Sequence, residues 1–198
     1  MRSRRPAVLV IAMLLYAMLI AGCGSRRSSP QEPAPTVAAS PVPSSRIDGF
    51  DLINTHRFPT TEAGVQYRYE DSSDLQADVY IYEGHAARYG ADVMAALRAE
   101  VGDFREGLPL GVRRGYYGAY SIVSDTLLTV RVAEHDYTLH RITLAVTRGG
   151  QSHDSYFYIA MVGREYVKVR ITQPTGKFPL TRADAFVHAV LEDVARKT

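Results

Sequence analysis

Residues 142–172, ITLAVTRGGQSHDSYFYIAMVGREYVKVRIT, contain three strand patterns separated by two glycine turns, and they decide the fold class. An apolar residue at every second position predicts a strand with one buried face. The turns at Gly149-Gly150 and Gly163-Arg164 are short enough to join antiparallel neighbours. These residues therefore predict an antiparallel meander. Its apolar runs are Ile142, Leu144 and Val146; Tyr156 to Val162; and Val167, Val169 and Ile171, which lie opposite Lys168, Arg170 and Thr172 before Pro174.

The residues on either side extend this meander. Upstream, Leu128, Val130 and Val132 alternate with Thr129 and Arg131 and predict one more strand. Downstream, five apolar residues recur at helical spacing, so we expect a C-terminal helix with Thr181 as its N-cap. Those five residues are Phe186, Val187, Val190, Leu191 and Val194.

Three more strands are predicted in the amino-terminal part of the domain, over 49–56, 65–70 and 76–82. The turn residues 71–74 (DSSD) join the second and third of them into a hairpin. In the third, Ala77, Val79 and Ile81 point to one face, and Asp78, Tyr80 and Tyr82 point to the other.

A helix is expected between the hairpin and the meander. Val93, Met94, Leu97, Val101 and Phe104 recur at helical spacing. Glycine and proline are the usual signals after a helix, so Gly107 and Pro109 predict its end and residues 108–111 a connection.

These elements predict an α+β domain over 46–198, with a single antiparallel sheet of about six to seven strands packed with two helices. The order of hairpin, helix, meander and closing helix resembles the PsbP/Mog1-type α/β/α sandwich over most of 48–197. Proteins of that type are mostly binding or assembly factors. The resemblance therefore implies a non-catalytic function. The strands 77–82 and 166–172 also look like those of uncharacterised bacterial lipoproteins.

The amino terminus predicts export. Arg2, Arg4 and Arg5 precede an apolar run over 7–21, which is short for a spanning helix and typical of a secretory signal. The run ends at LIAGC (19–23), where Cys23 is the only cysteine of the chain. This pentapeptide resembles the lipobox of bacterial lipoproteins, which implies cleavage after residue 22 and acylation of Cys23, with palmitate among the usual fatty acids. Gly24 follows, and the resemblance then favours the outer membrane in a cell with two membranes.

Residues 23–45 are predicted to be a lipidated cysteine followed by a disordered tether, because proline, serine and alanine dominate and large apolar residues are rare. The chain has 23 basic and 21 acidic residues, but five of the basic ones and only one acidic one precede Arg46. The domain itself is thus slightly acidic, which argues against nucleic acid as a partner. The membrane, reached through the lipid on Cys23, is the predicted partner.

The histidines and serines of the chain match no catalytic motif. Neither a paired His-x-His nor a HExxH helix occurs, and no nucleophile elbow surrounds a serine. SHDS (152–155) is interpreted as a polar turn. We expect His140 to be half-buried and hydrogen-bonded at the end of the sheet. The sequence predicts neither a bound metal nor another cofactor. The residues that could most readily act as metal ligands lie near predicted strand ends and are His135, Asp136, His140, His153 and Asp154.

The tyrosines are the strongest functional signal. The chain has 13 tyrosines and no tryptophan, and several tyrosines lie with basic residues opposite the apolar positions of their strands. Tyrosine and arginine together suit recognition, because both combine a large contact area with polar tips. The alternative is that these tyrosines pack in the core, under a helix. The candidate binding residues are Tyr80, Tyr82, Tyr116, Tyr117, Tyr120, Tyr156, Tyr158, Tyr166, Arg131, Lys168 and Arg170.

Three functions follow from these observations. The first is a membrane-anchored, non-catalytic binding or assembly module of the cell envelope, with a protein, glycan or lipid as its ligand. The second is an envelope hydrolase or transferase that uses His140, His153 and Asp154. The third is a structural spacer without a specific ligand.

Overall fold

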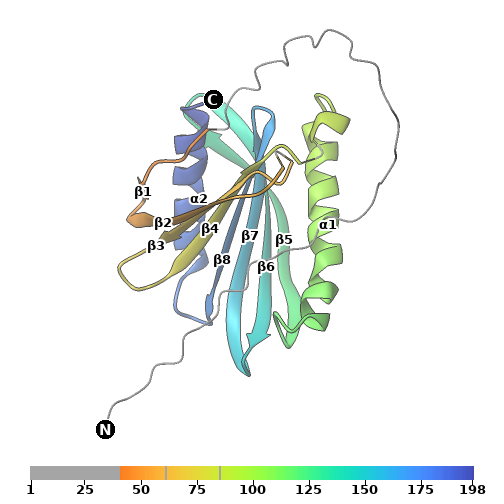
Figure 1. Ribbon diagram of the computed structural model, residues 1–198, viewed down its shortest axis with the longest axis vertical. Helices are drawn as coiled ribbons and strands as arrows, with labels where there is room; N and C mark the ends of the chain where they lie inside the picture. The colour runs from red at the N-terminus through yellow and green to blue at the C-terminus, as the bar shows by residue number, and fades with distance from the viewer. Residues whose placement is uncertain (1–40, 61, 85) are drawn as a thin grey trace, which may run out of the picture. The chain divides into compact units, whose positions relative to one another are not determined.

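The computed structural model describes residues 41–60, 62–84 and 86–198, and they build an eight-stranded antiparallel sheet with a helix on each face (Figure 1). The strand order is β1-β2-β3-β4-β8-β7-β6-β5. The strands are β1 Arg46–Ile47, β2 Phe50–Arg57, β3 Val65–Glu70, β4 Gln76–Tyr82, β5 Ala119–Val132, β6 His135–Arg148, β7 Gln151–Val162 and β8 Glu165–Pro174; the helices are α1 Val93–Arg113 and α2 Leu180–Ala195, with a 3-10 turn at Ala86–Arg88.

The predicted fold class is confirmed, with more strands than expected. The three predicted turns each join antiparallel neighbours: β3 to β4 at 71–75, β6 to β7 at Gly149-Gly150, and β7 to β8 at Gly163-Arg164. The additional strand is β1, which has two residues and therefore no alternation that a sequence pattern could reveal.

Helix α1 is longer than predicted, and the expected end at Gly107 and Pro109 is wrong. The helix continues to Arg113 and buries Leu108 and Gly111. A proline and a glycine both weaken a helix locally. The burial of Leu108 and Gly111, in the last part of α1, therefore outweighs this local cost.

The predicted limits of three other elements also need correction. Strand β5 begins at Ala119 rather than near Leu128, because a β-bulge between Ile122 and Ser124 breaks the alternation that would reveal it. Residues 152–155 lie inside β7 and do not form a turn. Helix α2 begins at Leu180 after Pro179, with no side-chain cap, so Thr181 is not the N-cap.

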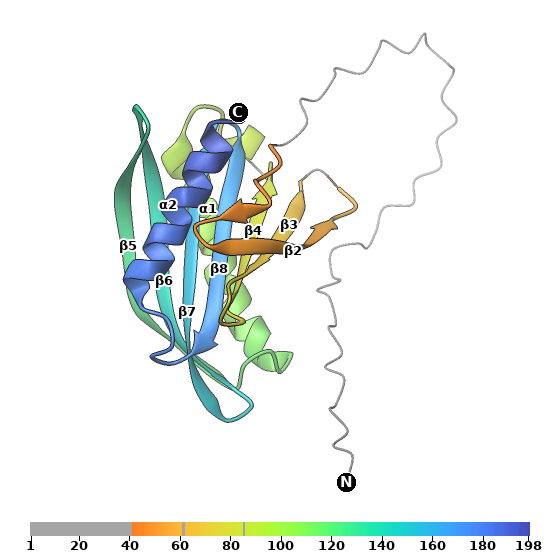
Figure 2. The same cartoon turned by 90° about the vertical axis from the view of Figure 1, so that its left-hand side faces the viewer.

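Each face of the sheet has its own apolar core. Figure 2 shows α2 lying diagonally across the strands of one face, with α1 behind the sheet. The core under α2 contains the inward residues of β3, β4 and β8, such as Val79 and Val169, together with Phe186 and Val190. The core under α1 contains Leu97 and Val101 of the helix and residues of β6 to β8.

The folded unit includes residues before β1. Asp193 of α2 accepts hydrogen bonds from the Ser44 backbone N–H (2.7 Å) and hydroxyl (2.6 Å), and Lys197 Nζ lies 3.0 Å from the Val42 carbonyl oxygen. The Tyr69 hydroxyl donates to the Ser44 carbonyl at 2.8 Å. The folded unit therefore starts before residue 46, the predicted first residue of the domain. Cys23, the predicted signal peptide and most of the tether lie outside the described residues. Among those described, no helix has the length and apolarity to cross a bilayer.

Candidate functional site

The structure does not form the exposed tyrosine face that the sequence suggested. Because a helix covers each face, Tyr82, Tyr117, Tyr156, Tyr158 and Tyr166 are buried. Tyr80 and Tyr120 are half-buried, and Tyr116 is 40% exposed in the loop after α1. The interpretation of these residues as core therefore holds for five of the eight candidate tyrosines.

Tyr156 and Tyr158 lie on the α2 side, away from the other candidates. The Tyr156 hydroxyl donates to the Phe178 carbonyl at 3.0 Å, and the Tyr158 hydroxyl donates to Asp184 at 2.8 Å. Burial and the bond to Asp184 raise the pKa of Tyr158 above its ordinary value. Both hydroxyls are thus satisfied inside the protein, and both side chains serve the core.

The remaining candidates on β4 and β8 meet on the α1 side. In the register of these strands, Tyr80 pairs with Lys168, and Tyr82 pairs with Tyr166. Arg170 follows on the same face of β8, opposite Asp78. We call Lys168, Arg170, Tyr80, Tyr82 and Tyr117 the Lys168–Arg170 site.

Lys168 lies between two tyrosine rings. Its Nζ is 4.9 Å from the ring centre of Tyr80 and 4.8 Å from that of Tyr82, both within the range of a cation–π contact. Burial lowers the pKa of Lys168, the charge of Glu100 opposes this shift, and Arg170 adds to it. The aromatic rings therefore hold a cation that has lost much of its water.

Arg170 contacts Tyr117, which lies in the loop just after α1. Its Nη2 donates to the Tyr117 hydroxyl at 3.1 Å, and the guanidinium carbon lies 5.6 Å from the ring centre. Tyr117 itself packs on Gly111 of α1 so closely that a Cβ at position 111 would lie 2.4 Å from the ring. The position of Arg170 thus depends on a glycine in the part of α1 that the sequence pattern missed.

Neither cation of the site has a carboxylate partner among the described residues. Asp78 is the neighbour of Arg170 across the strands, but its carboxylate accepts bonds from Arg68 Nε at 2.7 Å and Gln66 Nε2 at 2.8 Å. Glu100 is near enough for its charge to act on Lys168, but no described carboxylate forms an ion pair with either cation, and two adjacent unpaired cations favour a bound anion. Sequence reasoning missed Gln66, Arg68 and Asp78, although their alternation on β3 and β4 was visible.

Helix α1 orients the tyrosines of the site. The Tyr82 hydroxyl donates to Glu100 at 2.8 Å, and the Tyr166 hydroxyl donates to the Ala96 carbonyl at 3.2 Å. Burial raises the pKa of Tyr80 to about 12 and that of Tyr166 to about 12, so both hydroxyls stay protonated at neutral pH. The rings therefore present neutral faces and hydrogen-bond donors.

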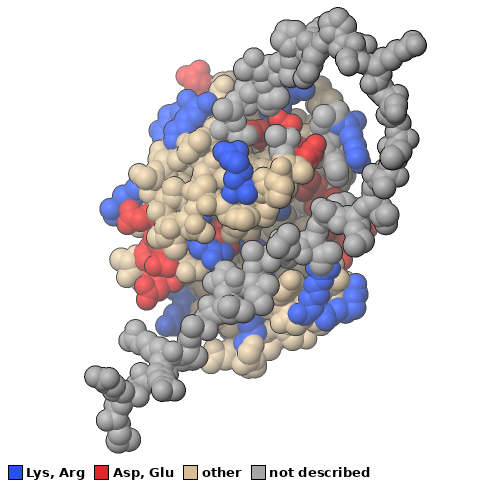
Figure 3. Space-filling view, viewed as in Figure 1, with Lys and Arg blue, Asp and Glu red and all other residues tan. Residues whose placement is uncertain are grey.

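Arg131 lies elsewhere. It is at the end of β5, the outer strand beyond β6, and its Nη1 lies 3.0 Å from Asp136 on the surface. Figure 3 shows basic and acidic side chains interspersed on the face turned to the viewer, where the described residues form no continuous basic patch. Among the described residues, neither Tyr116 nor Tyr120 is hydrogen-bonded to the Lys168–Arg170 site, although Tyr120 packs against the core under α1.

The histidine candidates are separate from one another. His153 pairs with Val146, six residues along β6 from His140, which corresponds to about 20 Å. His153 Nδ1 lies 3.1 Å from the Gln151 carbonyl, and Asp154 accepts from the Gly176 N–H at 3.0 Å. In the described part of the chain, no three His, Cys, Asp or Glu residues gather as a metal site.

His140 instead joins a network that the sequence did not reveal. Its Nε2 lies 2.5 Å from Asp125 Oδ1 on β5, and Arg105 of α1 pairs with the same carboxylate. Burial raises the pKa of Asp125, but the bonds from Arg105 and His140 outweigh it and the pKa is lowered. The network ties α1 to β5 and β6, and no serine or threonine of the described residues is hydrogen-bonded to it.

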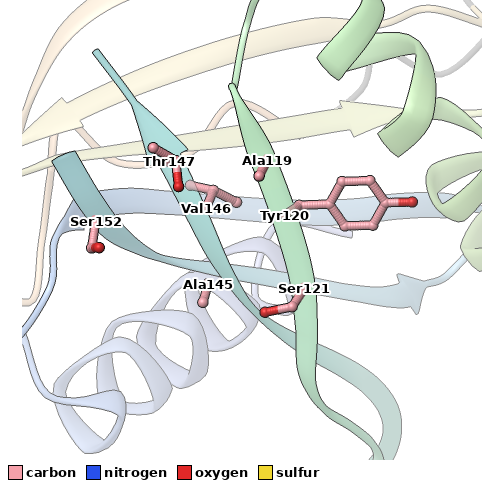
Figure 4. Close-up of a pocket in the computed structure, with 7 residues that line it drawn as sticks. All are labelled: Ala119, Tyr120, Ser121, Ala145, Val146, Thr147 and Ser152. Atoms are coloured by element: carbon pink, nitrogen blue, oxygen red, sulfur yellow. The ribbon is translucent and has the colours of Figure 1, made fainter. Parts of the chain in front are cut away.

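Two shallow depressions lie away from the Lys168–Arg170 site. The larger, of about 280 Å³, is lined by Tyr120, Ser121, Ser152 and small residues of β5 and β6. Figure 4 shows the Tyr120 ring directed away from Ser121 and Ser152, and no acid or base lines this depression. The second, of about 230 Å³, lies between β5 and α2 beside Asp184 and His188.

No protein-family model matches the chain, and no curated protein matches it in sequence.

Proposed function

We propose that this protein is an exported, lipid-anchored binding module of the cell envelope whose Lys168–Arg170 site holds an anionic group of its ligand. The observation that carries the proposal is the pair of adjacent cations, Lys168 and Arg170, which lack a carboxylate partner among the described residues. No step of chemistry is required of the site.

Lys168 and Arg170 are partly removed from water without gaining an ion pair in return, which costs free energy. A partly desolvated cation gains from an opposite charge more than an exposed one does, because water no longer screens the interaction. A phosphate or carboxylate bound here would accept from both Lys168 and Arg170. The hydroxyls of Tyr80 and Tyr117 would add donors and the rings an apolar contact.

The anchor is proposed from the sequence. The cationic start, the apolar run and LIAGC (19–23) support export and acylation of Cys23, and Gly24 favours the outer membrane in a cell with two membranes. The tether to the domain supports a ligand within reach of the membrane, such as a phosphorylated lipid head group. We also propose that the domain is of the PsbP/Mog1 type, which the element order and the helix on each face support.

The two other functions have less support. A hydrolase or transferase built on His140, His153 and Asp154 would require these residues to share a site, and they belong to three separate hydrogen-bond networks. The pair His140–Asp125 has the base-and-orienter arrangement, but Arg105 occupies the same carboxylate. A spacer without a ligand would have no use for two neighbouring cations held under a helix.

Binding can be tested on the full chain in mild detergent, labelled with carbon-13 at the lysine side chains. Lys168, Lys177 and Lys197 are the only lysines, so three signals suffice. We expect glycerol phosphate or acetate to shift the Lys168 signal saturably and to leave Lys177 unchanged. The anion that binds with the higher affinity, glycerol phosphate or acetate, indicates whether the ligand carries a phosphate or a carboxylate. Equal, unsaturable shifts at Lys168 and Lys177 would contradict the proposal.

Three variants test whether the anion binds at Lys168 and Arg170. Lys168→Met and Arg170→Gln each remove one cation, and we expect at least about a tenfold loss of affinity from either. Arg131→Gln is the matched control, because Arg131 is a surface arginine outside the site. The anchor is tested separately by incorporation of labelled palmitate, which Cys23→Ser should abolish.

A further inference from the structure

Strand β5 leaves one edge of the sheet open. It has 14 residues, pairs only with β6, and is the last strand in the sheet order. Among the described residues no strand lies against its outer side. A long open edge is a template for another strand, and proteins usually protect it with lysine, proline or a short length. Strand β5 has neither lysine nor proline, and its protection is limited to the bulge near Ile122, the charges of Asp125 and Arg131, and the contact of His188 with the Arg131 carbonyl.

The same strand exposes large apolar side chains. Ile122 is 45% exposed, Val123 is 65% exposed and Leu127 is 50% exposed. At the opposite edge β1 pairs only with Phe50 and Asp51, so the rest of β2 is also open, but it exposes one large apolar side chain, Ile53. The apolar exposure is therefore greater on β5, which is also the longer of the two open edges.

The backbone of β5 presents its free groups in a defined order. Val132 and His135 close the two-residue turn between β5 and β6, so their backbone groups face each other. Hydrogen-bonded pairs then alternate, and residues 125, 127, 129 and 131 direct their N–H and C=O groups outward. The Arg131 carbonyl points outward as this order requires, and it already accepts a bond from His188 Nε2 of α2 at 2.9 Å, so only its second lone pair is free for another strand.

The charges on this edge have partners within their own copy, Asp125 with Arg105 and His140 and Arg131 with Asp136, but their spacing along β5 is self-complementary. Asp125 and Arg131 lie on the same face of β5, three residues on either side of Leu128. In an antiparallel pair of two β5 strands centred on Leu128, each Asp125 lies opposite an Arg131, and each Leu127 lies opposite a Thr129. A pair centred on Asp125 would instead bring two carboxylates together. The pairing also joins outward-directed residues to each other, as hydrogen bonding requires.

We propose that a second copy of this chain binds along β5, antiparallel and centred on Leu128, so that the two sheets become continuous. The interface is two-fold symmetric and uses the same surface on both copies. It involves neither Lys168 nor Arg170, so it is independent of the proposed ligand site.

The first test measures association of the full chain in mild detergent by analytical ultracentrifugation. We expect a dimer that Leu127→Lys weakens at least tenfold, because it places a cation on the paired edge. Ile53→Lys is the matched control, since Ile53 is also 50% exposed but lies on β2. A monomer at all concentrations, or equal effects of the two lysines, would overturn the proposal.

The second test measures the register. In a Cys23→Ser background, Leu128→Cys leaves a single thiol that faces its own copy across the two-fold axis, with Cα atoms about 5 Å apart. Thr126→Cys is the control, because residue 126 faces residue 130 and two such thiols lie roughly 13 Å apart. We expect oxidation to cross-link the first variant only. Cross-linking of residue 126 alone, or a dimer that neither thiol cross-links, would show that another surface or partner occupies the edge.

Discussion

The two faces of the sheet use tyrosine in opposite ways. On the α2 face, Tyr156 and Tyr158 are buried and their hydroxyls bond to Phe178 and Asp184, so the side chains belong to a closed core. On the α1 face, Tyr80 and Tyr82 hold the ammonium of Lys168 between their rings. The same residue type thus fills space on one face and surrounds a charge on the other. What differs is whether the neighbouring strand contributes an apolar residue or a cation.

The register explains this difference. Tyr158 pairs with Val169 of β8, whereas Tyr80 pairs with Lys168. Apolar and basic residues alternate along β8: Val167, Val169 and Ile171 point to the α2 face, and Lys168 and Arg170 point to the α1 face. We therefore expect substitutions on the α2 face to change stability and substitutions on the α1 face to change binding.

The largest expected effect distinguishes the two faces directly. Tyr158→Ala leaves a cavity in the closed core and removes the bond to Asp184, so it should lower the free energy of unfolding by about 3–5 kcal/mol. Tyr80→Ala, on a half-buried residue, should cost less than half as much and should weaken anion binding. Urea unfolding followed by circular dichroism measures both. Equal losses of stability would show that Tyr80 is also a core residue.

A smaller effect is expected where α2 is fastened to residues before β1. Asp193 accepts bonds from Ser44 and Lys197 in a nearly buried position, and Asp193→Asn should cost about 2 kcal/mol at neutral pH. Asp136→Asn is the control, because its pair with Arg131 is exposed and such pairs contribute roughly 0–1 kcal/mol.

The cost of Asp193→Asn should depend on pH. Burial raises the pKa of Asp193, but the bonds from Ser44 and Lys197 outweigh it, so the pKa is lower than in the unfolded chain. The contribution of the carboxylate is therefore complete above the unfolded value of about 4 and is lost as the pH falls through the folded value. The variant and the wild type should converge in stability in acid. A difference that stays constant with pH would exclude the carboxylate charge as its cause.

The smallest expected effects concern two glycines of α1. A Cβ at Gly107 meets no atom, so Gly107→Ala should stabilise the protein by about 0.5–1 kcal/mol. A Cβ at Gly111 collides with the Tyr117 ring, so Gly111→Ala should destabilise it by about 1–2 kcal/mol. Because Tyr117 holds Arg170, Gly111→Ala should also weaken anion binding, whereas Gly107→Ala should not. Unfolding and the lysine-signal titration test the two variants together. Unchanged binding in Gly111→Ala would separate Tyr117 from the site.

Part of the candidate site was predictable from local patterns. Alternation on β4 and β8 places Tyr80, Tyr82, Lys168 and Arg170 opposite the apolar residues of their strands, and the structure brings these four together. Tyr156 and Tyr158 could not be assigned in the same way. Whether they share a face with Lys168 depends on the pairing of β7 with β8, which alternation within one strand does not specify.

The sequence by itself determined the antiparallel meander, the hairpin turns and the apolar face of α2, because each depends on neighbours within a few residues along the chain. Only the tertiary structure decided that α1 continues through Gly107 and Pro109, since the reason is the burial of Leu108 and Gly111. It also decided that Asp78 binds Arg68 and Gln66 instead of Arg170. That choice leaves two cations together, and it depends on which strands lie side by side, which no local pattern contains.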